Sequence, residues 1–538
     1  MDIQRNDLSQ ANSLFLRQNG SSPVHWQEWS PEILAHARRN KRIILVSSGY
    51  SSCHWCHQMS NETFSDPQVA DVLNRWCTCI LIDRERRPDI DQYCMDYLVA
   101  SRGTGGWPLN VFFSPELKPF YAFTFAPAKD DSEHQGILAI ITDALQYYRS
   151  NSKNISHFSV EWSKPPTTAE HQLDPIKTII EEYDPIHGGF GSGAKLPPYS
   201  TLLFLFYRFC YSPAPEIARI LQTTLDAMMC GALQDNVAGG FFRHCSDSSW
   251  ETPIFEKLLV DQAMQLWVFS LAERIFPGNG YRRAALGVIR CLERDFRIGC
   301  VYGSALDSDV CGIEGGAIIW TTDELAQSLN PAQRKILHSA YRFAELPSTS
   351  KTYKNDDRLH LIQRFPGSTD SHDTSLVVEH LRNQRAKMPH AQLDRTILAD
   401  ANCLTGIAFT VAARCLNIPR LRQRATEIFF FIQRNMFRDG NINHCFFQNK
   451  QSPSYFARDA AAYTLLADTL YEHSFAMQPH YEQAFSSLKK FHTKGKNWIE
   501  ADSPDFYPIP AASFDFPYPS TQGMIDLVYA RHAVRTNN

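Results

Sequence analysis

Two cysteines separated by two residues form the motif in this sequence that is best suited to chemistry. Cys53 and Cys56 stand in the run Cys-His-Trp-Cys, which follows the apolar segment 42–47 and the turn residues 48–50. This order predicts a strand, a turn and a helix that begins at the motif. The unpaired amides and the dipole of a helix N-terminus favour a thiolate over a thiol. Cys53 is therefore predicted to be a nucleophile.

A thiolate beside a second thiol can exchange disulfides. The Cys53 thiolate would attack a disulfide, and Cys56, within the same turn, would resolve the resulting mixed disulfide. A charged His54 would stabilise the thiolate further, and the dipeptide His54-Trp55 is expected to tune the reduction potential. The motif therefore predicts thiol–disulfide exchange with a partner protein, as reductant or redox sensor, without a cofactor.

Three other roles of the motif stay open. Cys-x-x-Cys-His is also the spacing of covalent haem attachment, although nothing else in the sequence indicates an axial ligand or export. Cys77 and Cys79 could supply a second thiol pair for zinc, although their spacing is a weak zinc signal. The third alternative is a pair of structural thiols without chemistry. We predict no metal.

A second motif supports the redox interpretation. The run Gly-Gly-Trp-Pro at 105–108 opens an apolar segment that is predicted to be a strand. In thioredoxin-type folds a proline at this place takes the cis form, which is otherwise a minority state, and lies against the cysteine pair. We therefore expect a cis bond between Trp107 and Pro108, beside Cys53 and Cys56.

The elements around the cysteine pair predict a small α/β domain. Helices are predicted at 31–40, 66–76 and 91–100, and strands at 42–47, 79–83, 108–114 and 119–125. Continuous apolar runs such as 42–47 are typical of strands that are covered on both faces. Helices and strands that alternate and end in a hairpin indicate an α/β sandwich.

The rest of the chain is predicted to be almost wholly helical. Apolar residues recur three and four positions apart at 199–210, 217–233, 257–276, 281–296, 399–416, 421–437 and 457–474. At roughly 30 residues for each helix and its loop, this part would hold about twelve helices, which close naturally into a ring of six hairpins. An open solenoid would satisfy the same pattern. We expect domains at 1–160 and 173–538, joined by a linker at 161–172.

Composition narrows the classes of function. The chain has 538 residues, and its 53 basic and 57 acidic side chains leave a formal net charge of −4, so no global field favours nucleic acid or an anionic membrane as a partner. Its 14 cysteines are too dilute for a disulfide-stapled scaffold. The first residues do not read as a secretory signal, and no apolar run reaches the ~18 residues of a membrane span. We therefore expect a cytoplasmic protein.

Longer motifs resemble the spermatogenesis-associated protein 20 family. They are SSGYSSCHWCHQMSNETFSD at 47–66, IDRERRPDID at 82–91 and GTGGWPLNVFFSPELKPFY at 103–121, and the resemblance continues at 184–205, 234–263 and 303–325. It implies an N-terminal thioredoxin-like fold that carries Cys53 and Cys56. It also implies a C-terminal domain similar to six-hairpin glycosidases, which is an (α/α)6 toroid.

The resemblance to glycosidases draws attention to the carboxylates of the helical half. Glycoside hydrolysis needs two carboxyl groups across a cleft, one protonated and one ionised. The residues that could line such a cleft are Arg243, His244, Glu256, Asp261, Asp307, Asp309 and Asp394. No spacing among them identifies a catalytic pair, and aspartates are also common caps in helix-hairpin loops. A saccharide ligand is therefore one alternative, and a toroid that only presents a binding surface is another.

Departures from the family pattern weaken the glycosidase alternative. Where the family has Pro-His-Phe-Glu-Lys-Met-Leu-Tyr-Asp-Gln, this chain has Ile254 in place of the histidine and Val260 in place of the tyrosine. Two side chains that could line a polar site are thus apolar. Asp307 and Asp309 with Glu314 also lack the ligand pattern of a known calcium loop. Thiol–disulfide chemistry is therefore the leading hypothesis.

Overall fold

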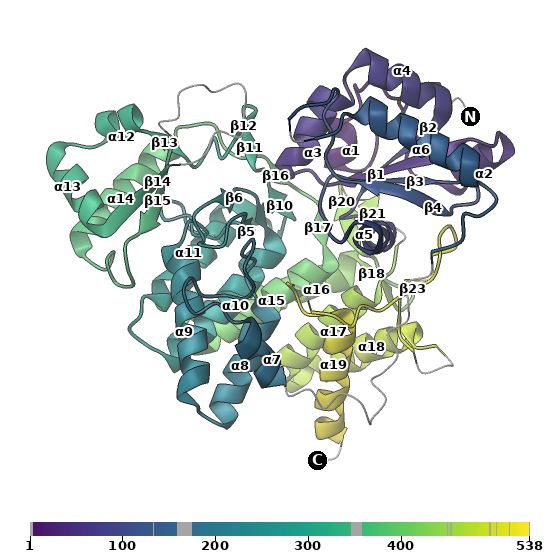
Figure 1. The fold of residues 1–538 in the computed structure, drawn as a ribbon. Helices are drawn as coiled ribbons and strands as arrows, with labels where there is room; N and C mark the ends of the chain where they lie inside the picture. The colour runs from purple at the N-terminus through teal and green to yellow at the C-terminus, as the bar shows by residue number, and fades with distance from the viewer. Residues whose placement is uncertain are drawn as a thin grey trace. The chain divides into compact units, whose positions relative to one another are not determined.

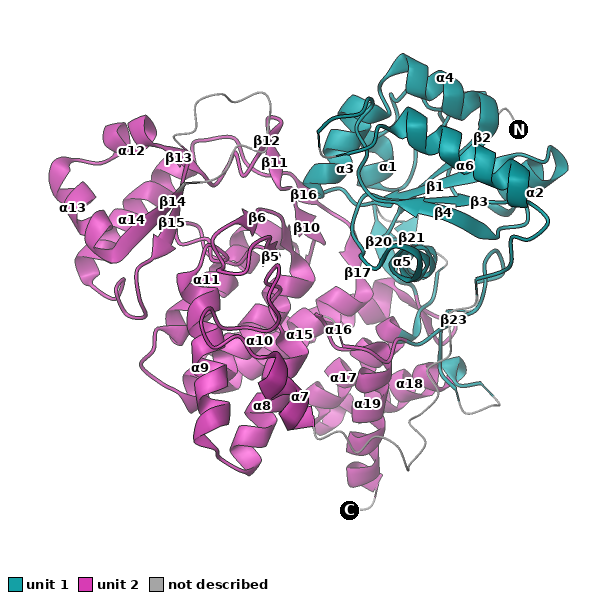
Figure 2. Cartoon of the chain, viewed as in Figure 1, with its two compact units in different colours: residues 1–163, 443–457, 490–511 teal, residues 164–442, 458–489, 512–538 magenta. Residues whose placement is uncertain are grey.

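The computed structural model describes residues 4–132, 134–158, 175–345, 358–448, 450–451, 454–493, 497–501, 503–515 and 517–536. The chain divides into two compact units, which Figure 2 colours separately. Unit 1 comprises residues 1–163, 443–457 and 490–511, and unit 2 comprises 164–442, 458–489 and 512–538. The expected linker at 161–172 lies outside the described residues.

Unit 1 is built on one four-stranded sheet, in the order β2-β1-β3-β4. The strands are β1 (Ile43–Gly49), β2 (Cys77–Asp83), β3 (Leu109–Phe113) and β4 (Pro119–Phe123). β1 and β2 run parallel, whereas β3 and β4 are antiparallel to their neighbours. Every residue of β1 and β2 is buried, as their continuous apolar sequences predict.

Helices cover both faces of this sheet (Figure 1). They are α1 (Leu14–Gln18), α2 (Pro31–Arg39), α3 (His54–Gln58), α4 (Pro67–Trp76), α5 (Pro88–Arg102) and α6 (Ile137–Asn151). α2 and α5 share one hydrophobic core with β1 and β3, and α4 and α6 lie across the sheet from α5. Ser30 and Asp66 cap α2 and α4, each followed by a proline at the first helical position. The predicted helices and strands of this domain are confirmed.

The core of unit 1 is completed by residues from far along the chain. The Phe506 ring packs edge-on against Trp29 and Tyr93, with ring centroids 5.3 and 5.1 Å apart. Ile509 belongs to the same hydrophobic core as α2 and α5. We expected 173–538 to form one helical domain, and the structure assigns 443–457 and 490–511 to unit 1.

An ion pair fixes the same segment. Arg87 donates to both carboxylate oxygens of Asp505, each at 3.0 Å, and to both oxygens of Asp89 at 2.9 Å. Ser503 also donates to Asp89, at 3.0 Å. The guanidinium thus bridges the first turn of α5 to residues that lie more than 400 positions away.

Unit 2 consists mainly of helices. They include α7 (Pro175–Glu182), α8 (Tyr199–Tyr211), α9 (Pro215–Cys230), α10 (Leu259–Ile275), α11 (Tyr281–Cys291), α15 (Ala399–Cys415), α16 (Arg420–Asn435), α17 (Ala457–Tyr471), α18 (Gln478–Leu488) and α19 (Thr521–Thr536). α10 and α15 pack together and are buried on nearly all sides, whereas α9 and α16 bury one face and expose the other. Inner helices surrounded by outer ones are the arrangement of the predicted (α/α)6 toroid, and this fold class is confirmed.

One part of unit 2 departs from the helical expectation. A three-stranded antiparallel sheet forms there from β13 (Trp320–Thr321), β14 (Tyr341–Glu345) and β15 (Arg358–Gln363). It packs with α12 (Thr322–Ser328), α13 (Pro331–Ala340) and α14 (His372–Arg385) around a separate core that includes Leu337, Leu361 and Leu381.

Among the helices that the structure describes, none is long and apolar enough to cross a bilayer.

The ion pair predicts that unit 1 depends on the C-terminal part of the chain. Asp505→Asn should lower the free energy of unfolding of unit 1 by about 1–2 kcal/mol, because the half-buried guanidinium of Arg87 loses one of its two carboxylates. Urea denaturation followed by tryptophan fluorescence measures this, since Trp29 contacts Phe506. Asp526→Asn, an exposed site on α19, is the control. Equal denaturation midpoints for the two variants would contradict the prediction.

Candidate active site

The cysteine pair lies where the sequence predicts it, at the turn from β1 to α3. Cys53 is the N-cap of α3, and its Sγ accepts a hydrogen bond from the Cys56 amide at 3.2 Å. Cys53 and Cys56 are joined by a disulfide, with their Cα atoms 5.2 Å apart. The sulfur of Cys53 therefore sits where a thiolate would be stabilised by the first amides of a helix.

The two residues between the cysteines differ in exposure. Cys53, Cys56 and His54 are buried, whereas the Trp55 side chain is 39% exposed. The Trp55 ring contacts the rings of His54 and Phe125, at centroid distances of 5.4 and 5.0 Å. Trp55 thus presents an aromatic surface next to the disulfide.

The Trp107–Pro108 peptide bond is cis, as expected. Leu109, the next residue, pairs with Ser48 at the end of β1, so Pro108 lies at the same end of the sheet as the cysteine turn. The Trp107 indole donates to Asp91 Oδ1 at 2.9 Å, and the Ser48 hydroxyl donates to the same oxygen at 2.6 Å. The Asp91 carboxylate therefore binds one residue from each segment beside the cysteine turn, Ser48 at the end of β1 and Trp107 just before β3.

Sequence reasoning did not identify Asp91 as part of this site. It lies on the first turns of α5, and burial raises its pKa, although Arg84 and the hydrogen bonds from Ser48 and Trp107 act in the opposite direction. The Arg84 guanidinium lies over the Tyr50 ring at 3.7 Å and over the Trp107 ring at 4.3 Å. The signal that could have found Asp91 is its place in the run IDRERRPDID.

The structure separates the cysteines that a zinc site would need. Cys77 and Cys79 lie at the start of β2, opposite Ile43 and Leu45, whereas Cys53 and Cys56 follow the end of β1. At about 3.3 Å per residue, the length of the strand places the two pairs on the order of 20 Å apart. The four thiols therefore do not form one metal site.

Glycine at position 49 is required by the packing of the cysteine pair. A Cβ added there would lie 2.7 Å from a ring carbon of Phe15 and 3.0 Å from Cys56 Sγ. Both distances are shorter than ordinary carbon contacts, so one of these neighbours would have to move. The turn that presents the disulfide thus depends on the absence of this side chain.

In unit 2, three of the predicted cleft residues lie together. Arg243 and Glu256 form an ion pair at 2.8 Å. The charge of Arg243 lowers the pKa of Asp261 on α10, and the charge of Glu256 raises it. Asp261 is buried, and its Oδ1 accepts hydrogen bonds from the Tyr199 and Tyr518 hydroxyls at 3.1 and 2.9 Å. Burial raises the pKa of Asp261 to about 7. Within the described residues, its Oδ2 has no hydrogen-bond partner.

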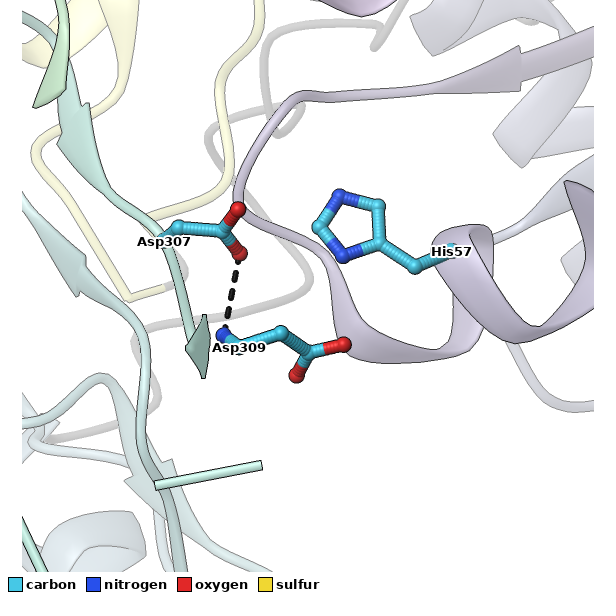
Figure 3. A group of neighbouring side chains, drawn as sticks. All are labelled: His57, Asp307 and Asp309. Atoms are coloured by element: carbon cyan, nitrogen blue, oxygen red, sulfur yellow. Dashed lines mark hydrogen bonds between the residues drawn. The ribbon is translucent and has the colours of Figure 1, made fainter. Parts of the chain in front are cut away.

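Short strands bring the other predicted carboxylates into one region of unit 2. β7 (Lys257–Leu258), β10 (Ala305–Leu306) and β16 (Leu393–Asp394) form a three-stranded sheet. Asp394 lies opposite Ala305 in this sheet, and Asp307 directly follows β10. The Asp309 amide donates to the Asp307 carboxylate at 3.0 Å, as Figure 3 shows. Asp394 thus lies on the strand that pairs with β10, and Asp307 lies at the end of β10.

His244 is the remaining predicted residue. It lies on β5 (His244–Cys245) and pairs with Ile254 on β6 (Pro253–Ile254), the position where the family has histidine. Burial lowers the pKa of His244 to about 4, so its ring is neutral at physiological pH. Its neighbour Ile254 is apolar, which agrees with the sequence comparison that found a histidine of the family replaced at this position.

Fold and site together define a thioredoxin-like domain joined to a helical toroid. Residues 5–164 match a family model described as Thioredox_DsbH, a protein of unknown function, DUF255. Spermatogenesis-associated protein 20 of Mus musculus is 29% identical over 483 residues, which cover 80% of this chain and 61% of the mouse protein. The chain thus spans about three fifths of that relative. The predicted resemblance to the spermatogenesis-associated protein 20 family is confirmed.

Solved structures resemble each part of the chain. A sugar epimerase from a ruminal bacterium matches 66% of this chain and 95% of its own, with 13% identity and a TM-score of 0.32. A DsbH oxidoreductase matches 23% of this chain and 85% of its own, with 19% identity and a TM-score of 0.18.

The close contacts at Gly49 predict that adding a methyl group there destabilises the protein, whereas the same change at Gly106 does not. Gly49→Ala should destabilise the oxidised protein by about 1–3 kcal/mol, because the new methyl group crowds Phe15 and Cys56 Sγ. Gly106→Ala is the control, since its Cβ would meet only Thr124 Cγ2, at 3.7 Å. Urea denaturation of both oxidised variants measures the difference. Similar unfolding free energies would contradict the crowding at Gly49.

The raised pKa of Asp261 predicts a pH dependence of stability. Between about pH 4 and pH 7 the Asp261 carboxyl group keeps its proton in the folded state and loses it in the unfolded state. The free energy of unfolding should therefore be highest at low pH and should fall as the pH rises to 7. Each unit of the pKa shift corresponds to about 1.4 kcal/mol. Asp261→Asn should flatten this part of the profile, and the exposed-site control Asp373→Asn should not. Denaturation midpoints from pH 4.5 to 8 test it; an unchanged slope in Asp261→Asn contradicts it.

Proposed function

We propose that this chain is a thiol–disulfide oxidoreductase or redox sensor that works through Cys53 and Cys56. The observation that carries the proposal is the position of Cys53, which caps α3 and receives the Cys56 amide at its sulfur. The disulfide that joins the pair adds to this support, because it shows that the two sulfurs can reach each other across one turn. The match to the thioredoxin-like family model supports the same chemistry.

The reaction would proceed by two exchanges. In the reduced protein, the Cys53 thiolate attacks one sulfur of a partner's disulfide, that bond breaks, and the other partner sulfur leaves as a thiolate and takes up a proton. The Cys56 thiolate then attacks Cys53 Sγ in the mixed disulfide and releases the second partner thiolate. Two electrons have passed to the partner, and Cys53 and Cys56 are oxidised. A partner dithiol runs the same steps in reverse.

The surroundings of the pair suit a protein partner. Trp55 and Phe125 form an aromatic surface that a partner's segment could contact, and Phe125 in turn contacts His134. Asp91 is a positioning residue in this proposal, because it holds Trp107 and Ser48 on either side of the turn. If the chain lies in the cytoplasm, the glutathione and thioredoxin systems there would supply the two electrons that reduce the pair again between reactions.

This function predicts separate roles for the two cysteines. Cys53→Ser should abolish reduction of a model disulfide such as oxidised glutathione, whereas Cys56→Ser should accumulate a mixed disulfide that mass spectrometry detects. In the reduced protein, alkylation rates against pH should give Cys53 a pKa below the ~8.5 of a free thiol.

An exposed cysteine outside the motif supplies the control. Cys210→Ser should leave the activity and the alkylation profile unchanged, and when combined with Cys56→Ser it should leave the trapped adduct unchanged. A Cys53 that alkylates like a free thiol, or a Cys53→Ser protein with full activity, would refute the proposal.

A second candidate function rests on Asp261. A buried carboxyl group that keeps its proton near pH 7 is suited to act as a general acid, and glycoside cleavage needs one. Glu256, paired with Arg243, could supply the ionised partner. If the toroid processes a saccharide, Asp261→Asn should lose hydrolysis or epimerisation across a saccharide panel while Cys53→Ser keeps it.

A further inference from the structure

A polar cavity of about 650 Å³ lies in unit 1, away from the cysteine pair. It is formed by the start of β2, by the residues that precede β1 and by the C-terminal end of α4. Because Cys53 follows the opposite end of β1, this cavity is separate from the redox site.

Cationic side chains dominate the wall of this cavity. Two arginines, Arg42 and Arg75, supply this charge, and two histidines also line the cavity, although burial and nearby arginines lower the pKa of His36. Among the described lining residues, Asp71 is the one carboxylate. Among the described residues, neither arginine forms an ion pair. The cavity thus has an excess of positive charge and room for a small anion.

Arg42 is held in place without being neutralised. Its guanidinium donates to the backbone carbonyls of Asn74 at 2.7 Å, Arg75 at 3.1 Å and Cys77. These carbonyls form the C-terminal end of α4, where the helix dipole is negative, so they orient the guanidinium and offset part of its charge, but no carboxylate pairs with it among the described residues. A preorganised arginine is what an oxyanion site requires.

Buried polar atoms on the cavity residues lack partners. Arg42 Nε, His36 Nδ1 and Thr78 Oγ1 are shielded from solvent and bond to nothing in the part of the chain that the structure describes. Buried polar atoms are normally hydrogen-bonded. Arg42 and Thr78 both line the cavity, and the N–H of Arg42 and the hydroxyl of Thr78 are donors.

The cavity's two thiols fit an anion and not a second redox pair. Burial raises the pKa of Cys77 to about 12 and that of Cys79 well above its usual value. Both are therefore neutral at physiological pH, so they neither attack disulfides nor repel an anion.

We propose that this cavity binds a phosphate group, either as free phosphate or on a small molecule, with Arg42 and Arg75 supplying the charge and Thr78 a hydrogen bond. The volume exceeds what inorganic phosphate fills, so a phosphorylated small molecule should bind at least as well. The site does not depend on the cysteine chemistry.

Isothermal titration with inorganic phosphate and with glycerol 3-phosphate, at constant ionic strength, tests the proposal. We expect saturable binding of one or both ligands to the full chain. Tighter binding of glycerol 3-phosphate identifies the organic phosphate as the better fit, and equal binding identifies the phosphate group alone as the determinant. Cys53→Ser should bind like the parent, which separates this site from the proposed redox function.

Variants locate the binding. Arg75→Gln and Thr78→Val should each weaken binding, Arg75→Gln by about tenfold. These two variants keep the test decisive even if Arg42→Gln fails to fold, since Arg42 also caps α4. Arg102→Gln is the matched control, because Arg102 likewise donates to a backbone carbonyl but does not line the cavity. Absence of saturable binding, or parental affinity in both Arg75→Gln and Thr78→Val, overturns the proposal.

Discussion

The contact between Arg87 and Asp505 is the interaction on which the order of unit 1 rests. Its two 3.0 Å hydrogen bonds join the start of α5 to a segment from the last tenth of the chain. Closing so long a loop costs only a few kcal/mol more than closing a short one, and the burial of Phe506 against Trp29 and Tyr93 offsets this cost. The thioredoxin-like fold is therefore not an appended module; the C-terminal part of the chain completes its core.

This contact reaches the cysteine pair through one helix. Arg87 immediately precedes α5, and α5 carries Asp91 four positions later. Asp91 receives the Trp107 indole and the Ser48 hydroxyl, which flank the turn that leads to Cys53. Because the start of α5 is anchored in this way, the position of the Asp91 carboxylate beside the cysteine turn is fixed as well. The geometry of the redox turn is set partly by residues that take no part in its chemistry.

Local signals explain what could be predicted from the sequence. The Ser30-Pro31 and Asp66-Pro67 caps, the apolar run of β1 and the Cys-x-x-Cys spacing each act over a few residues, and the structure has all of them. The return of 490–511 to unit 1 depends on burial against partners hundreds of residues away, which no local pattern encodes. The role of Asp91 on α5 was missed because its partners lie on other elements, Ser48 on β1 and Trp107 just before β3.

Two buried carboxylates of unit 2 show how a structural group differs from a candidate reactive one. Asp235 receives Lys257 and Arg385, each at 2.8 Å, and these cations hold its pKa well below the usual range. Its charge is fully compensated, so it stabilises the fold and has little left to offer a ligand. Among the described residues, Asp261 receives hydrogen bonds from neutral hydroxyl donors alone, both on one oxygen, and burial raises its pKa to about 7. A buried acid with a bare oxygen is poorly explained by stability alone, which makes Asp261 the residue of the toroid where chemistry should be sought first.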